Sequence, residues 1–73
     1  MGGTARERVA ANVRRLREDV RGYTQTRLAE LAGCDERQIR YIEAGANVTL
    51  ATLDQLATAL RVDVAELLAP VSG

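Results

Sequence analysis

The chain has 73 residues, a length that fits one small domain with a marginal hydrophobic core. Its ten basic residues are all arginine, and it has one cysteine, Cys34, and no histidine. This composition excludes histidine-based metal sites, histidine general bases and internal disulfides. No apolar run approaches the roughly 20 residues of a membrane span, so we expect a cytoplasmic protein that is complete as written and has no cofactor.

The net charge of zero hides an uneven distribution along the chain. Residues 1–43 hold nine arginines against seven acidic residues, whereas residues 44–73 hold one arginine against three. Arginine suits bidentate contact with phosphate or guanine better than lysine does. The N-terminal half is therefore expected to carry the basic face.

The apolar spacing predicts five helices and no strand, and the first helix begins at a capping box. Thr4 and Glu7 have the capping-box spacing at the start of a helix over 5–20. Its inward-facing residues at helical spacing are Val9, Val13, Leu16 and Val20.

The second and third predicted helices are short and are separated by a brief turn. Thr24 can cap a helix over 25–32. Asp35, followed by Gln38, predicts a capping box for the third helix, which ends at Gly45. The expected inward-facing residues are Leu28, Ala29, Leu31 and Ala32 in the second helix and Ile39 and Ile42 in the third.

Two further helices complete the predicted set. Thr49 opens a helix over 50–60 that has a leucine stripe along one face. Asp63 and Glu66 form a third predicted capping box, at the start of a helix of one or two turns.

The turn between the second and third helices indicates what the protein does. Gly33-Cys34-Asp35 is too brief for an antiparallel hairpin and forces the two helices to cross steeply, as in a helix-turn-helix. In that arrangement the third helix enters the major groove of DNA. The sequence thus predicts an all-α, five-helix DNA-binding domain over residues 1–73, with its core in residues 4–69.

The outward positions of the third helix hold residue types that read base edges. They are Glu36, Arg37, Gln38, Arg40 and Tyr41. Arg37 can donate twice to guanine, Glu36 can accept from cytosine, and Gln38 can pair with adenine. Simpler roles stay open: solvated surface charge for the arginines, stabilisation of the helix N-terminus for Glu36, and cover for the core for Tyr41.

The sequence resembles the Cro/cI-like, lambda-repressor-like helix-turn-helix regulators of the xenobiotic-response-element type. The family pattern appears as Gln25, Leu28-Ala29, Ala32-Gly33, Ile39, Ile42-Glu43 and Gly45, and it continues as Asn47-Val48-Thr49-Leu50, Thr52-Leu53, Leu56-Ala57, Ala59-Leu60, Val62 and Leu67-Leu68. The resemblance covers residues 9–68 and implies a compact five-helix fold and a transcriptional regulator, a repressor or autoregulator. The Asn-Val-Thr-Leu segment is similar to that of restriction–modification controller proteins.

The resemblance also implies roles for individual residues. It implies phosphate contacts from Gln25 and the amide at the start of its helix, a backbone contact from Asn47, and base contacts from Glu36, Arg37 and Arg40, with Tyr41 beside them on base or backbone. We also expect backbone contacts from Thr24 and Arg27. An ion pair between Arg17 and Glu43 is implied as well. Two spacings depart from the family: the segment from Arg17 to Gln25 is one residue longer, and the loop after Gly45 is one residue shorter.

One reading helix covers too few base pairs for useful specificity, so we expect a homodimer on a palindromic operator. The third helices of the two protomers would then lie about 34 Å apart. The expected interface residues are Leu50, Leu53, Val62, Val64, Leu67 and Leu68. RNA polymerase is a further candidate partner, because activation would need a surface that touches it, and the bound protein would lie at the nucleoid.

A second hypothesis is an antitoxin or another interaction module that uses the same fold to hold a partner protein. An enzyme is not expected, because the sequence has no phosphate-binding glycine loop, nucleophile–base pair or metal-ligand cluster.

Cys34 precedes a helix cap, where a lowered thiol pKa would permit a redox switch. The competing interpretation is that Cys34 is a small apolar filler.

Overall fold

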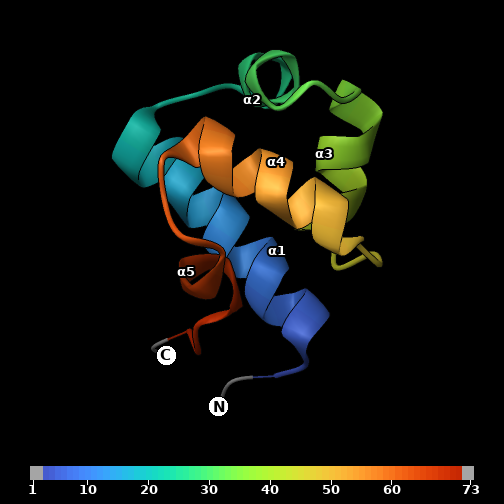
Figure 1. Ribbon diagram of the computed structural model, residues 1–73, viewed down its shortest axis with the longest axis vertical. Helices are drawn as coiled ribbons and strands as arrows, with labels where there is room; N and C mark the ends of the chain where they lie inside the picture. Colours follow the sequence, from blue (N-terminus) through green and yellow to red (C-terminus); the bar gives the residue numbers. More distant parts are fainter. Residues whose placement is uncertain (1–2, 72–73) are drawn as a thin grey trace.

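The computed structural model describes residues 3–71 and folds them into helices, with no strand in that range. In chain order the elements are α1 (Ala5–Arg15), the π-helical turn η1 (Leu16–Arg21), α2 (Gln25–Ala32), α3 (Glu36–Glu43), α4 (Leu50–Leu60) and α5 (Val64–Leu68). Figure 1 shows α2 and α3 at one end, α1 and α4 crossing through the middle, and α5 beside α1 near both termini. The all-α prediction is confirmed. None of the described helices combines the length and the apolar character that crossing a bilayer requires.

The core is aliphatic and draws on every α-helix. Its buried members are Val9, Val13, Leu16, Leu28, Ala29, Ala32, Ile39, Ile42, Leu53, Leu56, Ala57, Ala59, Leu60 and Leu67. Burying one leucine or isoleucine side chain contributes about 1.5–3 kcal/mol, so these contacts supply most of the force that holds the helices together. In this core α2 packs against α3 and α4, while α1 packs against α3 and α5.

The end of the first predicted helix differs from expectation. From Leu16 the backbone winds as a π-helix, and the N–H groups of Gly22 and Tyr23 both donate to the carbonyl oxygen of Arg17. A π-turn holds more residues than an α-turn, and this one lies in the segment from Arg17 to Gln25 that is one residue longer than the family spacing. The changed winding also turns Val20 outward to 53% exposure, and its predicted inward position is wrong.

Leu31 was also expected to face the core, but its side chain is 41% exposed. The buried face of α2 is centred on Leu28, Ala29 and Ala32. At 3.6 residues per turn, Leu31 falls at the edge of that face, beside Asp54 of α4.

Only one of the three predicted capping boxes forms in full. The N–H of Glu7 donates to Thr4 Oγ1 at 3.2 Å, and the N–H of Thr4 donates to Glu7 Oε1 at 2.8 Å. Asp35 occupies the N-cap position of α3 but makes no side-chain cap hydrogen bond. At α5 the side chain of Asp63 accepts from the N–H of Ala65, so this cap is a single bond and not a box.

Candidate nucleic-acid interface

A tight turn sets the angle between α2 and α3. Gly33 closes α2 in the left-handed conformation (φ +74°), which residues with a side chain adopt only under strain. The N–H of Cys34 then donates to the carbonyl oxygen of Ala29 at 3.0 Å and satisfies the end of the helix. In Figure 1 α2 is seen nearly end-on while α3 runs down the side, so the two helices cross steeply as predicted.

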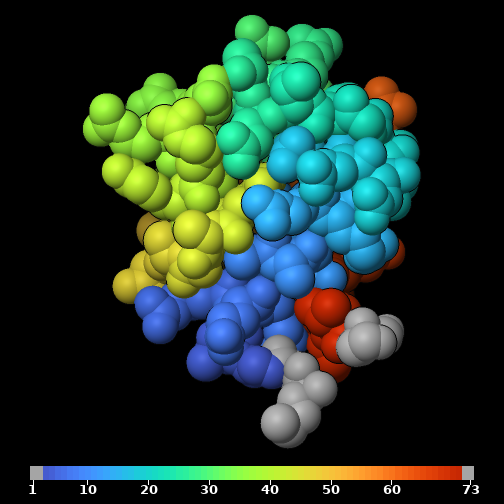
Figure 2. Space-filling model, turned by 180° about the vertical axis from the view of Figure 1, so that it is seen from behind, coloured from blue at the N-terminus to red at the C-terminus, as the bar shows by residue number. Residues whose placement is uncertain are grey.

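Helix α3 has a sharply divided surface. Ile39 and Ile42 are buried, whereas the opposite face exposes Arg37, Gln38, Arg40 and Tyr41. Tyr41 is 57% exposed, so its ring is mostly free of the core. Figure 2 shows α3 (green) along one edge of the molecule, next to the loop that leads to α4 (yellow). This edge is free to approach a flat or grooved partner.

The arginines of α2 and α3 differ in how strongly they are already engaged. Arg27 forms an exposed ion pair with Glu30 at 3.3 Å, and Arg40 pairs with Glu36 at 2.7 Å. Within residues 3–71, Arg37 makes no ion pair and no side-chain hydrogen bond. Its five guanidinium N–H donors are therefore available to an external acceptor.

Two further predicted site residues have weak partners inside the chain. The amide nitrogen of Gln38 lies 3.5 Å from Thr52 Oγ1, at the long limit of a hydrogen bond. The side-chain oxygen of Asn47, in the loop after α3, accepts from Arg6 NH1 at 3.3 Å. Both side chains are therefore only weakly engaged within the described residues.

The start of α2 uses its side chains internally. Thr24 Oγ1 caps the helix by accepting from the N–H of Arg27 at 3.0 Å. Gln25 is half-buried and donates its amide to Glu43 Oε1 at 3.1 Å. The groups left for a phosphate at this end are the backbone N–H groups of the first helical turn, which the helix dipole makes attractive to anions.

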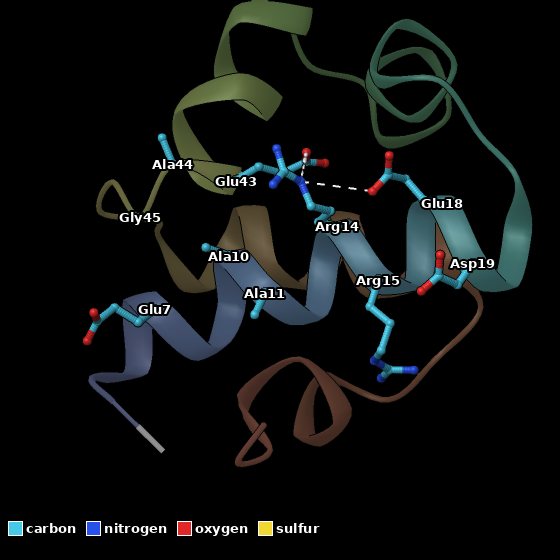
Figure 3. Close-up of a pocket in the computed structure, with 10 residues that line it drawn as sticks. All are labelled: Glu7, Ala10, Ala11, Arg14, Arg15, Glu18, Asp19, Glu43, Ala44 and Gly45. Carbon is cyan, nitrogen blue, oxygen red and sulfur yellow. Dashed lines mark ion pairs between the residues drawn. The ribbon is translucent and has the colours of Figure 1, made fainter. Parts of the chain in front are cut away.

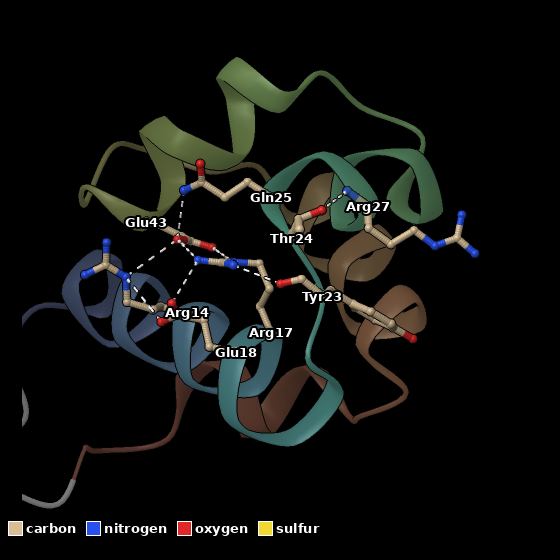
Figure 4. A network of polar contacts seen from close by, with 8 residues as sticks. All are labelled: Arg14, Arg17, Glu18, Tyr23, Thr24, Gln25, Arg27 and Glu43. Atoms are coloured by element: carbon tan, nitrogen blue, oxygen red, sulfur yellow. Dashed lines mark hydrogen bonds and ion pairs between the residues drawn. The ribbon is translucent and has the colours of Figure 1, made fainter.

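A single carboxylate fixes α3 against the elements before it. Arg17 of η1 contacts Glu43 of α3 through Nε–Oε2 at 2.6 Å and NH2–Oε1 at 3.0 Å. Arg14 of α1 approaches the same carboxylate at 3.7 Å, and Figure 4 shows both arginines and Gln25 pointing toward it. The hydrogen bonds that Arg17 donates to Glu43 raise the pKa of Arg17 above the ordinary value of an arginine. We call Arg14, Arg17, Gln25 and Glu43 the Glu43 network.

Sequence reasoning missed three residues of this region. Arg14 lies one helical turn before Arg17, so helical spacing would have placed it near Glu43. Arg6 contacts Asn47 across 41 positions of sequence, and Thr26 donates to Glu36 across the turn. No local pattern signals these two contacts, because they depend on how the helices pack.

A groove of about 460 Å³ lies between α1 and the end of α3 (Figure 3). Its small residues are Ala10, Ala11, Ala44 and Gly45, and its charged residues are Glu7, Arg14, Arg15, Glu18, Asp19 and Glu43. Four carboxylates against two guanidinium groups make this groove a poor site for DNA phosphates. The exposed face of α3 is the better candidate.

Cys34 does not have the environment of a redox switch. Its side chain is half-buried and packs against the core. Burial, and then the charge of Asp35, raise the pKa of the Cys34 thiol above its ordinary value. A reactive cysteine needs the opposite shift, so the structure favours the role of a small filler.

The residues expected at a dimer interface fall into two groups. Leu53 and Leu67 are 4% and 0% exposed and belong to the core of the single chain, so they have no free surface for a second copy. Leu50 is 76% exposed. The half-buried residues that pack against the core and keep some exposed surface are Val62, Val64 and Leu68.

The comparisons with known proteins agree with this geometry. A family model described as Helix-turn-helix (HTH_3) matches residues 13–67. The chain belongs to this helix-turn-helix family. The HTH_3 match spans all elements from the end of α1 to α5, and it identifies the chain as a DNA-binding domain of the transcription-regulator type. A search of curated proteins gave no match.

Solved structures with the same fold are regulators. The restriction-modification controller protein C.AhdI from Aeromonas hydrophila is 35% identical, with a TM-score of 0.79 over 85% of this chain and 94% of that one. The hypothetical transcription factor NHTF from Neisseria is 30% identical, with a TM-score of 0.89 over 96% and 80% of the two chains. The clp gene regulator ClgR from C. glutamicum is also 30% identical, with a TM-score of 0.80 over 89% and 84%. Within residues 3–71, this HTH_3 domain holds no group of histidine, cysteine or acidic residues able to bind a metal ion.

Proposed function

We propose that this protein is a sequence-specific transcriptional regulator that binds a palindromic operator as a homodimer, with α3 of each protomer in the major groove. The observation that carries the proposal is the exposed face of α3. Arg37, Arg40 and Tyr41 project from it, whereas Ile39 and Ile42 anchor its other side in the core. These exposed residue types are those that recognise base edges and phosphates.

Rigid support of α3 strengthens the proposal. The Glu43 network ties the C-terminal end of α3 to α1, η1 and α2. A reading helix held in this way keeps its side chains in register with the groove, so little ordering cost remains at binding. In the proposed complex, Gln38 joins the base contacts, while Thr24, Gln25, Arg27 and Asn47 lie along the DNA backbone.

The proposed homodimer uses the α4–α5 end of the molecule. Leu50 is exposed at the start of α4, whereas the half-buried Val62, Val64 and Leu68 lie after the end of α4 and in α5. Two-fold pairing doubles the number of base pairs read, which a single short helix needs for a useful specificity ratio. Similarity to a restriction-modification controller protein supports a small regulator of this kind, and we propose that it acts as a repressor or autoregulator.

Selection from a random duplex pool at about 150 mM salt tests the proposal, because nonspecific phosphate binding is weakened there. We expect enrichment of an inverted repeat whose half-sites are centred about one helical turn apart. Enrichment of an undivided single site would refute the homodimer. If the recovered duplexes show no sequence preference over the starting pool, base reading by α3 is refuted and a protein partner is favoured instead.

A further inference from the structure

The carboxylate of Glu36 lies at the helix-turn-helix junction with a partner on each side. Its Oε1 accepts a hydrogen bond from Thr26 Oγ1 of α2 at 2.5 Å. Its Oε2 accepts from Arg40 NH1 of α3 at 2.7 Å. Both oxygens of Glu36 are therefore engaged within the chain, and a hydroxyl of one helix is linked through it to an arginine of the next.

Several effects favour this arrangement in the unbound protein. Glu36 is the first residue of α3, where the helix dipole stabilises a negative charge. Glutamate four residues before arginine is also the favourable order for a pair along a helix. The pair is half-exposed and weak by itself, with 43% and 52% of the two side chains accessible. The hydroxyl of Thr26 adds an anchor from outside the helix.

Arg40 keeps N–H donors free while Glu36 holds its guanidinium group. Arg40 uses NH1 for Glu36, and Nε and NH2 make no hydrogen bond within residues 3–71. A free arginine loses rotamer entropy when it binds a base edge, and an arginine that is already oriented loses less. Glu36 thus has a use that does not require it to touch DNA.

We propose that Thr26 and Glu36 are positioning residues that orient Arg40 for base reading, so that a side chain of α2 affects the base preference of α3. This inference rests on the proposed function. It assigns Glu36 a role different from the direct cytosine contact that its residue type suggests.

Base preference after substitution of Thr26 tests the inference. Thr26→Val keeps the side-chain shape but removes the hydroxyl, whereas Thr26→Ser keeps the hydroxyl and serves as the control. In the duplex selection, we expect Thr26→Val to reduce the preference at the base pair read by Arg40 about fivefold, the effect of one hydrogen bond. Thr26→Ser should retain that preference. Affinity for unselected duplex should be unchanged in both variants.

Two further variants separate positioning from direct contact. Arg40→Ala defines which base pair Arg40 reads, and Thr26→Val added to it should cause no further change. Glu36→Gln should weaken the preference at that same base pair. An altered preference at a different base pair would show that Glu36 reads DNA itself and would overturn the inference.

The remaining outcomes are also decisive. If Thr26→Val retains the wild-type base preference, positioning is refuted while the proposed function stands. The same holds if adding Thr26→Val to Arg40→Ala reduces the base preference further. If the wild-type protein selects no sequence, the proposed function fails and this inference fails with it.

Discussion

The guanidinium of Arg17 and the carboxylate of Glu43 face each other in a bidentate ion pair that ties the end of the first helical segment to α3. The two contacts measure 2.6 and 3.0 Å, and the side chains are only 9% and 2% exposed. Water therefore screens this pair poorly. Removing Glu43 leaves the buried guanidinium of Arg17 with only the carbonyl oxygen of Tyr23 at 2.9 Å and the exposed carboxylate of Glu18 at 3.8 Å as partners. The pair should matter for stability far more than the exposed pairs do.

Glu43→Gln removes the charge while keeping the side-chain volume. We expect a loss of about 3 kcal/mol in the free energy of unfolding, because Arg17 keeps its charge in a poorly hydrated position. Urea unfolding followed by circular dichroism measures the loss. Glu30→Gln is the matched control, since Glu30 pairs with Arg27 on the surface, where the side chains of Arg27 and Glu30 are 57% and 61% exposed. It should cost no more than about 0.5 kcal/mol, and equal losses in the two variants would contradict the assignment.

Acidification should weaken the start of α1. Hydrogen bonds from the backbone and then the side chain of Thr4 lower the pKa of Glu7 below the ordinary value of a glutamate. A lowered folded-state pKa means that the stabilisation is present above the ordinary pKa and is lost as the pH falls through the folded value. An NMR titration of the Glu7 carboxyl carbon should show the low pKa in the wild type and a higher one in Thr4→Pro, which has neither the backbone N–H nor the hydroxyl. An unchanged pKa in Thr4→Pro would contradict this account.

The exposed face of α3 was predictable because it depends on local spacing alone. Ile39 and Ile42 lie three residues apart on one side of a helix, which leaves Arg37 and Arg40 on the other. The Arg17–Glu43 contact was a different case. Twenty-six positions separate the two residues, and only resemblance to a known family suggested that they meet.

Features that depend on packing between helices could not be predicted. The π-helical winding at Leu16–Arg21 is one such feature, and nothing in the apolar spacing signals it. Asp35 makes no side-chain cap hydrogen bond, and the amide of Gln38 lies 3.5 Å from Thr52 Oγ1 of α4. The contact of Thr26 with Glu36 likewise forms only after the turn has brought the two helices together.

The exposed position of Leu50 allows a direct test of the proposed dimer. Leu50→Gln should reduce self-association. At concentrations low enough for both proteins to be single chains it should leave the unfolding midpoint unchanged, because the side chain is 76% exposed there. Light scattering at tens of micromolar should give about twice the 7.9 kDa chain mass for the wild type and a lower value for the variant. Val20→Gln is the control, because Val20 is 53% exposed on η1, outside the proposed interface, and should not change the mass. A wild-type mass of one chain would refute the dimer.

Arg37 offers the sharpest test of base reading, because it has no ion pair to break within the described chain. Arg37→Ala should weaken binding to the selected operator by about 1–3 kcal/mol and relax the preference at one base pair of each half-site. Arg37→Lys keeps the charge but loses the bidentate fork, so it should lose the base preference while keeping the salt dependence. Fluorescence anisotropy at several salt concentrations measures both quantities.

Arg15→Ala is the matched control for Arg37, since Arg15 is an exposed arginine of α1 that points away from Glu43 and α3 in Figure 3. It should leave base preference and operator affinity nearly unchanged. If Arg37→Ala instead weakens binding to every duplex equally and lowers the salt slope by about one, Arg37 contacts phosphate. Base reading would then belong to the other exposed residues of α3, because a phosphate contact carries no sequence information.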